Sequence, residues 1–174
     1  MAVQRRFESN GNPQKERKTE YVNTTNSTMD LTQRPPRSPR VKLGGYVILP
    51  RILDKGRASL AGKLGEYHFS GKGMDRHFFD FVGLDYESLK AELAKGASDS
   101  EVLAWIQANA KQQRQPWEIS AWSEYHLRRG PDSDVETFQY FADEVKKFAP
   151  AREDIQTWFD LMDLDDYCSF GGKA

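Results

Sequence analysis

Helix start and stop signals recur along this chain and leave little room for other secondary structure. The firmest start is the capping box Ser98-Asp99-Ser100-Glu101, in which a serine and a glutamate satisfy each other's backbone N–H groups. The firmest stop is Arg129-Gly130-Pro131, where a basic turn precedes glycine and proline. Between such signals apolar residues recur every three or four positions, as they do on helices. The pattern predicts an all-α fold, a compact bundle of six or seven short helices.

The expected helices are closely spaced. Ser38 is expected to cap a first helical turn that begins at Pro39 and is interrupted by Gly44-Gly45. The later helices are expected, in chain order, over residues 49–60, 75–83, 85–96, 98–106, 116–129, 134–149 and 151–165. Their expected N-caps include three aspartates, Asp75, Asp85 and Asp134. The pattern also allows one short extended segment near residues 64–69, which is aromatic and precedes a glycine turn.

The composition of the chain changes near Met29. Residues 1–28 are rich in Asn, Thr, Ser, Gln, Lys and Arg and contain few large apolar groups. Such a segment buries too little to offset the entropy of ordering it, so it predicts a disordered N-terminal tail. Residues 29–174 are long enough for a single helical domain, which at about 150 residues folds without a disulfide or metal.

Charge is divided unequally along the chain. Residues 1–76 carry 15 Lys and Arg against 7 Asp and Glu, whereas residues 77–174 carry 10 against 19. The asymmetry fits either an anion-binding arm or a basic segment that folds back onto an acidic body. We favour the second interpretation because it requires no partner.

A candidate ligand site lies in residues 37–67, where cations, tyrosines and close glycines gather. The candidate residues are Arg37, Arg40, Tyr46, Arg51, Asp54, Arg57, Glu66 and Tyr67. Arginine forks bind phosphate or carboxylate through two hydrogen bonds, so the segment predicts a small anionic ligand held by Arg40, Arg51 and Tyr46. Asp54 would orient these cations. In the competing interpretation Asp54 pairs with Arg51 or Arg57, and the remaining cations meet acidic helices.

Neither a metal nor a cofactor is expected. His77 and Asp80 lie three residues apart and would need Glu124 or His126 to complete a metal site, but no closely spaced histidine pair is present. Cys168 is the only cysteine, so it forms no internal disulfide, and no base is evident that would make it a nucleophile.

Six short motifs together resemble a known family. They are Asp30-Leu31-Thr32, Pro36-Arg37-Ser38-Pro39-Arg40, Leu43-Gly44-Gly45-Tyr46, Leu49-Pro50-Arg51, Asp54-Lys55 and Leu64-Gly65-Glu66-Tyr67. This set resembles domain of unknown function 5069, a family of small bacterial proteins. The likeness covers most of the chain from Asp30 onward and leaves out residues 1–28. No activity is assigned to the family, so the resemblance implies no function.

Three classes of function stay open. In the first class the chain binds a small anionic ligand or an acidic protein partner through residues 37–67. Alternatively it is an enzyme acting on a small anionic substrate, with an acid–base group drawn from Asp54, Glu66, His77 or Tyr46. In the third class it is a structural or interaction protein with no small-molecule site.

Other properties of the sequence narrow the setting. No nucleic-acid module is recognisable, so specific nucleic acid binding is not expected. No run of eighteen apolar residues is present, so no membrane span is expected. The first thirty residues lack the apolar stretch of a secretory signal, and the expected location is the cytoplasm. The sequence does not indicate an oligomeric state.

Overall fold

The computed structural model describes residues 29–174, and the tail expected over residues 1–28 lies outside this range. The described residues form seven helices and no strand, so the expected all-α fold is confirmed. The helices are α1 (Leu49–Leu60), α2 (Met74–Val82), α3 (Tyr86–Leu93), α4 (Asp99–Asn109), α5 (Pro116–Arg128), α6 (Val135–Phe148) and α7 (Trp158–Ser169). No described helix has the length and apolar character required to cross a membrane.

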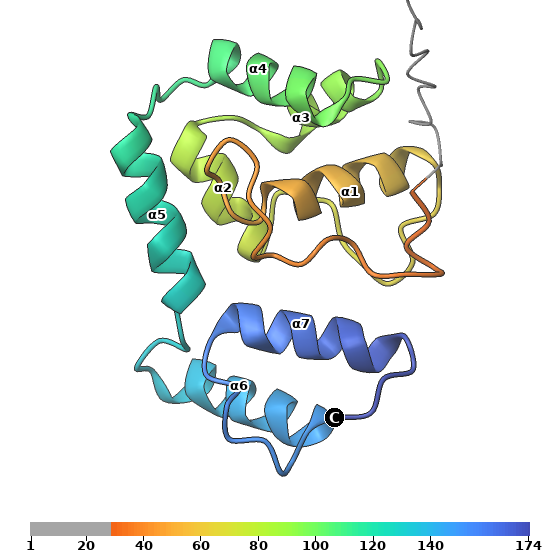
Figure 1. Cartoon of the computed structure of the whole chain (residues 1–174), viewed down its shortest axis with the longest axis vertical. Coiled ribbons are helices and arrows are strands. Elements are labelled where there is room, and N and C mark those ends of the chain that lie inside the picture. Colours follow the sequence, from red (N-terminus) through yellow and green to blue (C-terminus); the bar gives the residue numbers. More distant parts are fainter. Residues whose placement is uncertain (1–28) are drawn as a thin grey trace, which may run out of the picture.

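The helices form two groups joined by α5 (Figure 1). Helices α1 to α4 gather at one end of the molecule, and α6 and α7 pack together at the other. The chain from Met29 to Ile48 passes between α1 and α7 (Figure 1). Hydrogen bonds from Ser38 and Arg40 to Asp163 show that this segment contacts α7 directly. Part of the basic segment after Met29 therefore lies against the acidic last helix.

Helix α1 lies at the centre of the core and is buried nearly all around. Its apolar residues Leu49, Ile52 and Leu53 are fully buried, and so are the charged residues Arg51, Asp54 and Lys55 between them. A helix of this kind cannot turn its charged face to water. Each buried charge on α1 must therefore find a partner within the protein.

Gly56 marks the closest approach between α1 and α3. A Cβ atom at this position would lie 2.4 Å from Cδ1 of Leu93 and 3.2 Å from Cζ of Phe69. We expect Gly56→Ala to lower the free energy of unfolding by about 1–3 kcal/mol, because overpacking outweighs the helix propensity that alanine gains. Urea denaturation measures this. Adding Leu93→Ala provides space for the new methyl group, so the double variant should be less destabilised than the sum of the single ones. An unchanged stability of Gly56→Ala would contradict the close packing.

Most of the expected helix boundaries are confirmed. Ser98 and Glu101 form the complete capping box of α4, and Asp85 and Asp134 accept hydrogen bonds from the third residues of α3 and α6. Helix α5 begins at Pro116 and ends before Gly130, as its start and stop signals predict.

The predicted cap of α2 is wrong. Gly73 occupies the N-cap position, and Asp75 lies in the first turn of the helix. The carboxylate of Asp75 is buried and accepts two hydrogen bonds from Nζ of Lys55, at 2.7 and 2.6 Å. The carboxylate of Asp75 therefore pairs with the buried ammonium group of Lys55 and does not accept a hydrogen bond from a backbone N–H of α2.

The predicted helical turn at Ser38 and Pro39 is also wrong. The chain reverses at Gly44 and Gly45, which have φ values of 58° and 86°, and a single bridge joins Leu43 to Tyr46. Such backbone angles are incompatible with a right-handed helix and favour glycine. The hydroxyl of Ser38 accepts from the backbone N–H of Arg40 at 3.2 Å, as a cap would, and it also donates to Asp163, but no helix follows it.

Two further expectations change at residues 64–69 and at the last helix. Residues 64–69 contain no strand, and the described residues offer them no β-pairing partner. Helix α7 begins at Trp158, seven residues later than expected, because Thr157 and Asp160 form a capping box that overrides the earlier alanine start.

Candidate functional site

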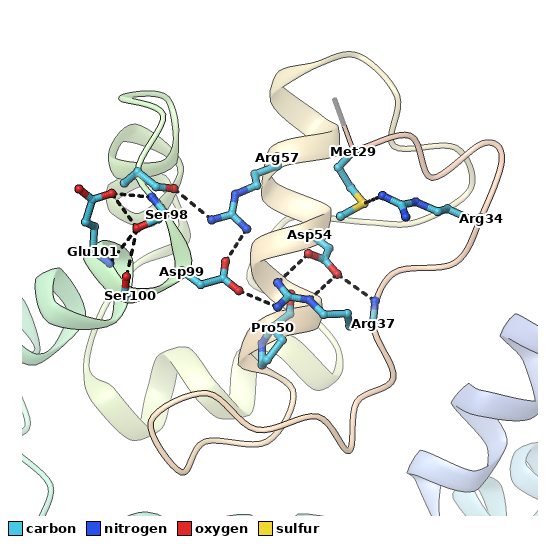
Figure 2. Close-up of polar contacts among 11 residues, drawn as sticks. Met29, Arg34, Arg37, Pro50, Asp54, Arg57, Ser98, Asp99, Ser100 and Glu101 are labelled. Carbon is cyan, nitrogen blue, oxygen red and sulfur yellow. Dashed lines mark hydrogen bonds and ion pairs between the residues drawn. The ribbon is translucent and has the colours of Figure 1, made fainter. Parts of the chain in front are cut away.

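The guanidinium group of Arg37 joins the start of the described chain to α1 and α4 (Figure 2). Its Nε and Nη2 donate to the two carboxylate oxygens of Asp54, at 2.9 and 2.8 Å. Nη1 donates to Asp99 at 2.6 Å, and Nη2 also reaches the carbonyl oxygen of Pro50 at 3.1 Å. The backbone N–H of Arg37 donates to Asp54 as well, at 2.9 Å. The competing interpretation had expected Asp54 to pair with Arg51 or Arg57. In the structure Asp54 pairs with Arg37 instead.

A second arginine completes this cluster (Figure 2). Nη1 of Arg57 donates to Asp99 at 2.6 Å, and its Nη2 donates to the carbonyl oxygen of Ala97 at 3.1 Å. Burial opposes the charged form of Asp99, but hydrogen bonds from Arg37 and Arg57 outweigh it and hold the pKa of Asp99 below its ordinary value. Asp99 therefore stays ionised and bridges two cations.

Helix α7 supplies the carboxylates for two further arginines. Arg40 donates to Asp160 and, at 3.1 Å, to Asp163. Arg51 donates to both oxygens of Asp166, at 2.5 and 3.0 Å. The side chains of Arg51 and Asp166 are only 5% and 8% exposed, so this pair is buried. Each pair joins the basic segment to α7.

Tyr67 belongs to the buried pair on α7. Its hydroxyl donates to Oδ1 of Asp166 at 2.7 Å, and its ring lies 5.4 Å from the guanidinium carbon of Arg51. Burial, followed by the hydrogen bond to Asp166, raises the pKa of Tyr67. Tyr67 is thus a neutral donor that adds a third hydrogen bond to the two that Asp166 accepts from Arg51.

Tyr46 and Glu66 lie apart from these pairs. Tyr46 is buried among aromatic rings, 5.5 Å from the ring of Phe78 and 6.3 Å from that of Trp122. Glu66 is exposed, and it forms no ion pair within the described part of the chain. The structure therefore brings six of the eight candidate residues into ion pairs or hydrogen bonds and leaves these two outside.

All seven Lys and Arg residues between positions 37 and 67 form ion pairs with carboxylates of the same chain. Besides the arginine pairs above, they are Lys42 with Glu124, Lys55 with Asp75, and Lys63 with Asp30. Residues 37–67 therefore agree with the second interpretation of the charge asymmetry, in which a basic segment folds back onto an acidic body. Sequence spacing did not identify the carboxylate partners, since most lie more than forty residues away. The only signal was the excess of acid after residue 76.

The three-residue spacing of His77 and Asp80 does not gather metal ligands. Within residues 29–174 no group of three or more His, Cys, Asp or Glu side chains is placed to hold a metal ion. Nε2 of His77 lies 3.1 Å from Nη1 of Arg129, and its ring centre lies 5.1 Å from that of His126. His126 is 3% exposed and packs between two rings, that of Trp122 of α5, which is tilted by 59° against it, and that of Phe159 of α7, which lies nearly parallel to it at 6.5 Å.

An apolar groove of about 580 Å³ lies beside α6, a feature that sequence analysis missed. Four residues of α6 form a stripe at helical spacing along it, namely Phe138, Phe141, Ala142 and Val145. The stripe is only partly covered by α7. Phe141 packs edge-on against Trp158 at 5.2 Å and is 7% exposed, whereas Phe138 is 61% exposed. The spacing predicts an apolar helix face, but it does not reveal that the described residues cover this face only in part.

The remaining lining of the groove comes from the segments that flank α6. Pro131 precedes the helix, and Pro150 and Ile155 follow it. Lys146 and Gln156 supply the polar side chains of the lining. The groove therefore combines a wide apolar floor with few hydrogen-bonding groups, which suits apolar side chains more than a charged metabolite.

Comparison with known proteins agrees with the motifs of the basic segment. The model of the family described as "Domain of unknown function (DUF5069)" matches residues 33–168. A search of curated proteins finds no match to the chain. The matched range covers most of the chain and includes both the paired cations and the groove beside α6. The chain therefore belongs to the domain of unknown function 5069 family.

Proposed function

We propose that this chain is an interaction domain without catalytic chemistry, which binds a helical segment of another protein in the groove beside α6. The proposal rests on the apolar stripe of α6, where Phe138 is 61% exposed above a hollow of about 580 Å³. Single exposed apolar residues are common, but a contiguous apolar hollow marks a binding surface. A stripe at helical spacing is the kind of surface against which another helix packs.

The alternative of a small anionic ligand on residues 37–67 faces an energetic obstacle. The ligand would have to displace carboxylates that already occupy the guanidinium groups of Arg37, Arg40, Arg51 and Arg57. Displacement from the most buried pair would leave Asp166 uncompensated, at a cost of several kcal/mol. An acidic protein partner on this segment meets the same competition. The ion pairs are better explained as internal connections that hold α7 on α1.

The enzyme alternative lacks a convergent set of groups among the described residues. The four acid–base candidates are dispersed: Asp54 is paired with Arg37, Glu66 is exposed, Tyr46 lies in the aromatic core, and His77 contacts Arg129. Catalysis requires such groups to converge on one bound substrate. The proposal retains the cytoplasm as the location, which a chain with a single cysteine suits.

Site-specific photocrosslinking in cells tests the proposal. A photoreactive benzoylphenylalanine replaces Phe138 in the groove or, as a matched control, Tyr125, which is 57% exposed on α5. We expect a discrete adduct from position 138 only, with the crosslink mapping to a helical segment of a partner. That segment, made as a peptide, should bind the full chain and lose affinity at least about tenfold in Phe138→Ser. Identical adducts from both positions, or a peptide that ignores Phe138→Ser, would refute the proposal.

A further inference from the structure

We infer that the partner segment is a basic amphipathic helix, with apolar residues on one face and Lys or Arg on its flanks. This inference rests on the proposed function and adds the chemistry of the partner. It follows from the charge of the part of the chain that forms the groove, which is predominantly acidic. Residues 130–174 contain 11 Asp and Glu but only 4 Lys and Arg.

The acidic residues lie at the borders of the groove. Asp132 and Asp134 adjoin Pro131 at one border, and Glu153 and Asp154 adjoin Ile155 at another. All four are exposed; Asp132 and Asp154 also form surface ion pairs with Arg129 and Arg152, and Asp134 caps α6, which leaves Glu153 and Asp134 outside the ion pairs of the described residues. Exposed charges act over about 8–10 Å at moderate salt, which is far enough to reach the flanks of a helix seated on the apolar floor. Cations on those flanks would both accelerate binding and stabilise the complex.

The cation in the lining constrains how the partner lies. Lys146 borders the groove. Its charge disfavours a partner cation directly opposite and favours either a carboxylate or the carbonyl end of the partner helix there. The partner's cations therefore belong on the sides that face the acidic borders.

The same charge argues against a second copy of this chain as the occupant. Two acidic C-terminal regions would face each other across such an interface, since residues 130–174 place five carboxylates but only two cations outside the ion pairs of the described chain. Like charges brought together at an interface disfavour association. The basic residues of segment 37–67 could not compensate, because each is already paired within its own chain.

Two labelled model peptides test the inference by fluorescence anisotropy with the full chain. Both are about 18 residues long, with leucines at identical helical spacing, and differ only in carrying Lys or Glu elsewhere. We expect the Leu/Lys peptide to bind at least about tenfold more tightly at 0.05 M salt, with the difference shrinking several-fold near 0.5 M. Phe138→Ser should weaken its binding, whereas Tyr125→Ser, a matched exposed aromatic on α5, should not.

The outcomes separate the two proposals. Equal affinities for both peptides, each lost in Phe138→Ser, would overturn the basic character of the partner and leave the interaction function standing. Binding of neither peptide, or binding that Phe138→Ser leaves intact, would overturn both. Sedimentation of the full chain without peptide provides a last check. A dimer that Phe138→Ser dissociates would place a second copy in the groove and overturn the inference.

Discussion

Replacing Arg51 by alanine is expected to lower the free energy of unfolding by about 3–5 kcal/mol. Arg51 donates two hydrogen bonds to Asp166, and both side chains are more than nine-tenths buried. Removal of the guanidinium would leave a carboxylate inside the protein with only the hydroxyl of Tyr67 to compensate it. Because Asp166 lies on α7, the loss should also loosen the packing of that helix on α1. Urea denaturation followed by circular dichroism measures the change.

Two controls distinguish burial from charge itself. Arg76→Ala removes an arginine that is 71% exposed and pairs with Asp80 one helical turn away, so it should cost less than about 1 kcal/mol. Replacing Arg51, Tyr67 and Asp166 together by Met, Phe and Leu removes every polar member of the buried cluster. That variant should recover most of the stability, since apolar groups of similar size replace buried ion pairs well. An Arg51→Ala cost as small as that of Arg76→Ala would contradict the central role of the buried pair.

Acid should destabilise the protein between about pH 6.5 and pH 4. Burial lowers the pKa of His126 to about 4, and the positive charges of His77 and Arg129 add to this effect. A histidine in the unfolded chain titrates near 6.5. Between these values the unfolded chain binds more protons than the folded one, so stability falls as the pH falls and the loss is complete below pH 4. The expected loss is roughly 2–3 kcal/mol. Urea denaturation at a series of pH values measures it.

His126→Phe isolates the contribution of this ring. Phenylalanine retains the aromatic contacts with Trp122 and Phe159 but cannot accept a proton. The variant should therefore show a much shallower slope between pH 6.5 and 4. A residual slope is expected from His77, whose pKa burial and Arg129 also lower. Asp99, whose pKa is also lowered, contributes mainly below this range, because its stabilisation is lost as the pH falls toward and below the ordinary aspartate pKa of about 4, and it does so equally with and without His126. A slope unchanged in His126→Phe would contradict the assignment.

The sequence predicts the local parts of this fold well because helix starts and stops depend on neighbouring residues. The capping box at Ser98 and the stop at Gly130 use partners within about four positions, and both are confirmed. At Ser38 the hydroxyl accepts the local hydrogen bond expected of a cap, but no helix follows because the chain reverses at Gly44 and Gly45. The cap expected at Asp75 failed because Lys55 recruits the carboxylate.

The candidate site shows the same limit more sharply. Residue types and the charge asymmetry correctly marked residues 37–67 as unusual, but whether an arginine faces a ligand or a carboxylate depends on tertiary packing. Arg40 and Arg51 meet carboxylates more than a hundred residues away. The groove was missed for a related reason. The stripe containing Phe138 and Val145 reads as an ordinary core-facing helix side, and only the fold shows that the elements of residues 29–174 cover it in part and leave Phe138 exposed.

The central claim is that the groove beside α6, and not the basic segment 37–67, is the binding surface. Backbone amide spectra of the 15N-labelled full chain, recorded during titration with the Leu/Lys peptide, test it most directly. The account predicts that signals from Phe138, Phe141, Val145 and Ile155 shift progressively, while those of residues 37–67 stay in place. Shifts concentrated in residues 37–67, or no shifts along α6, would contradict it.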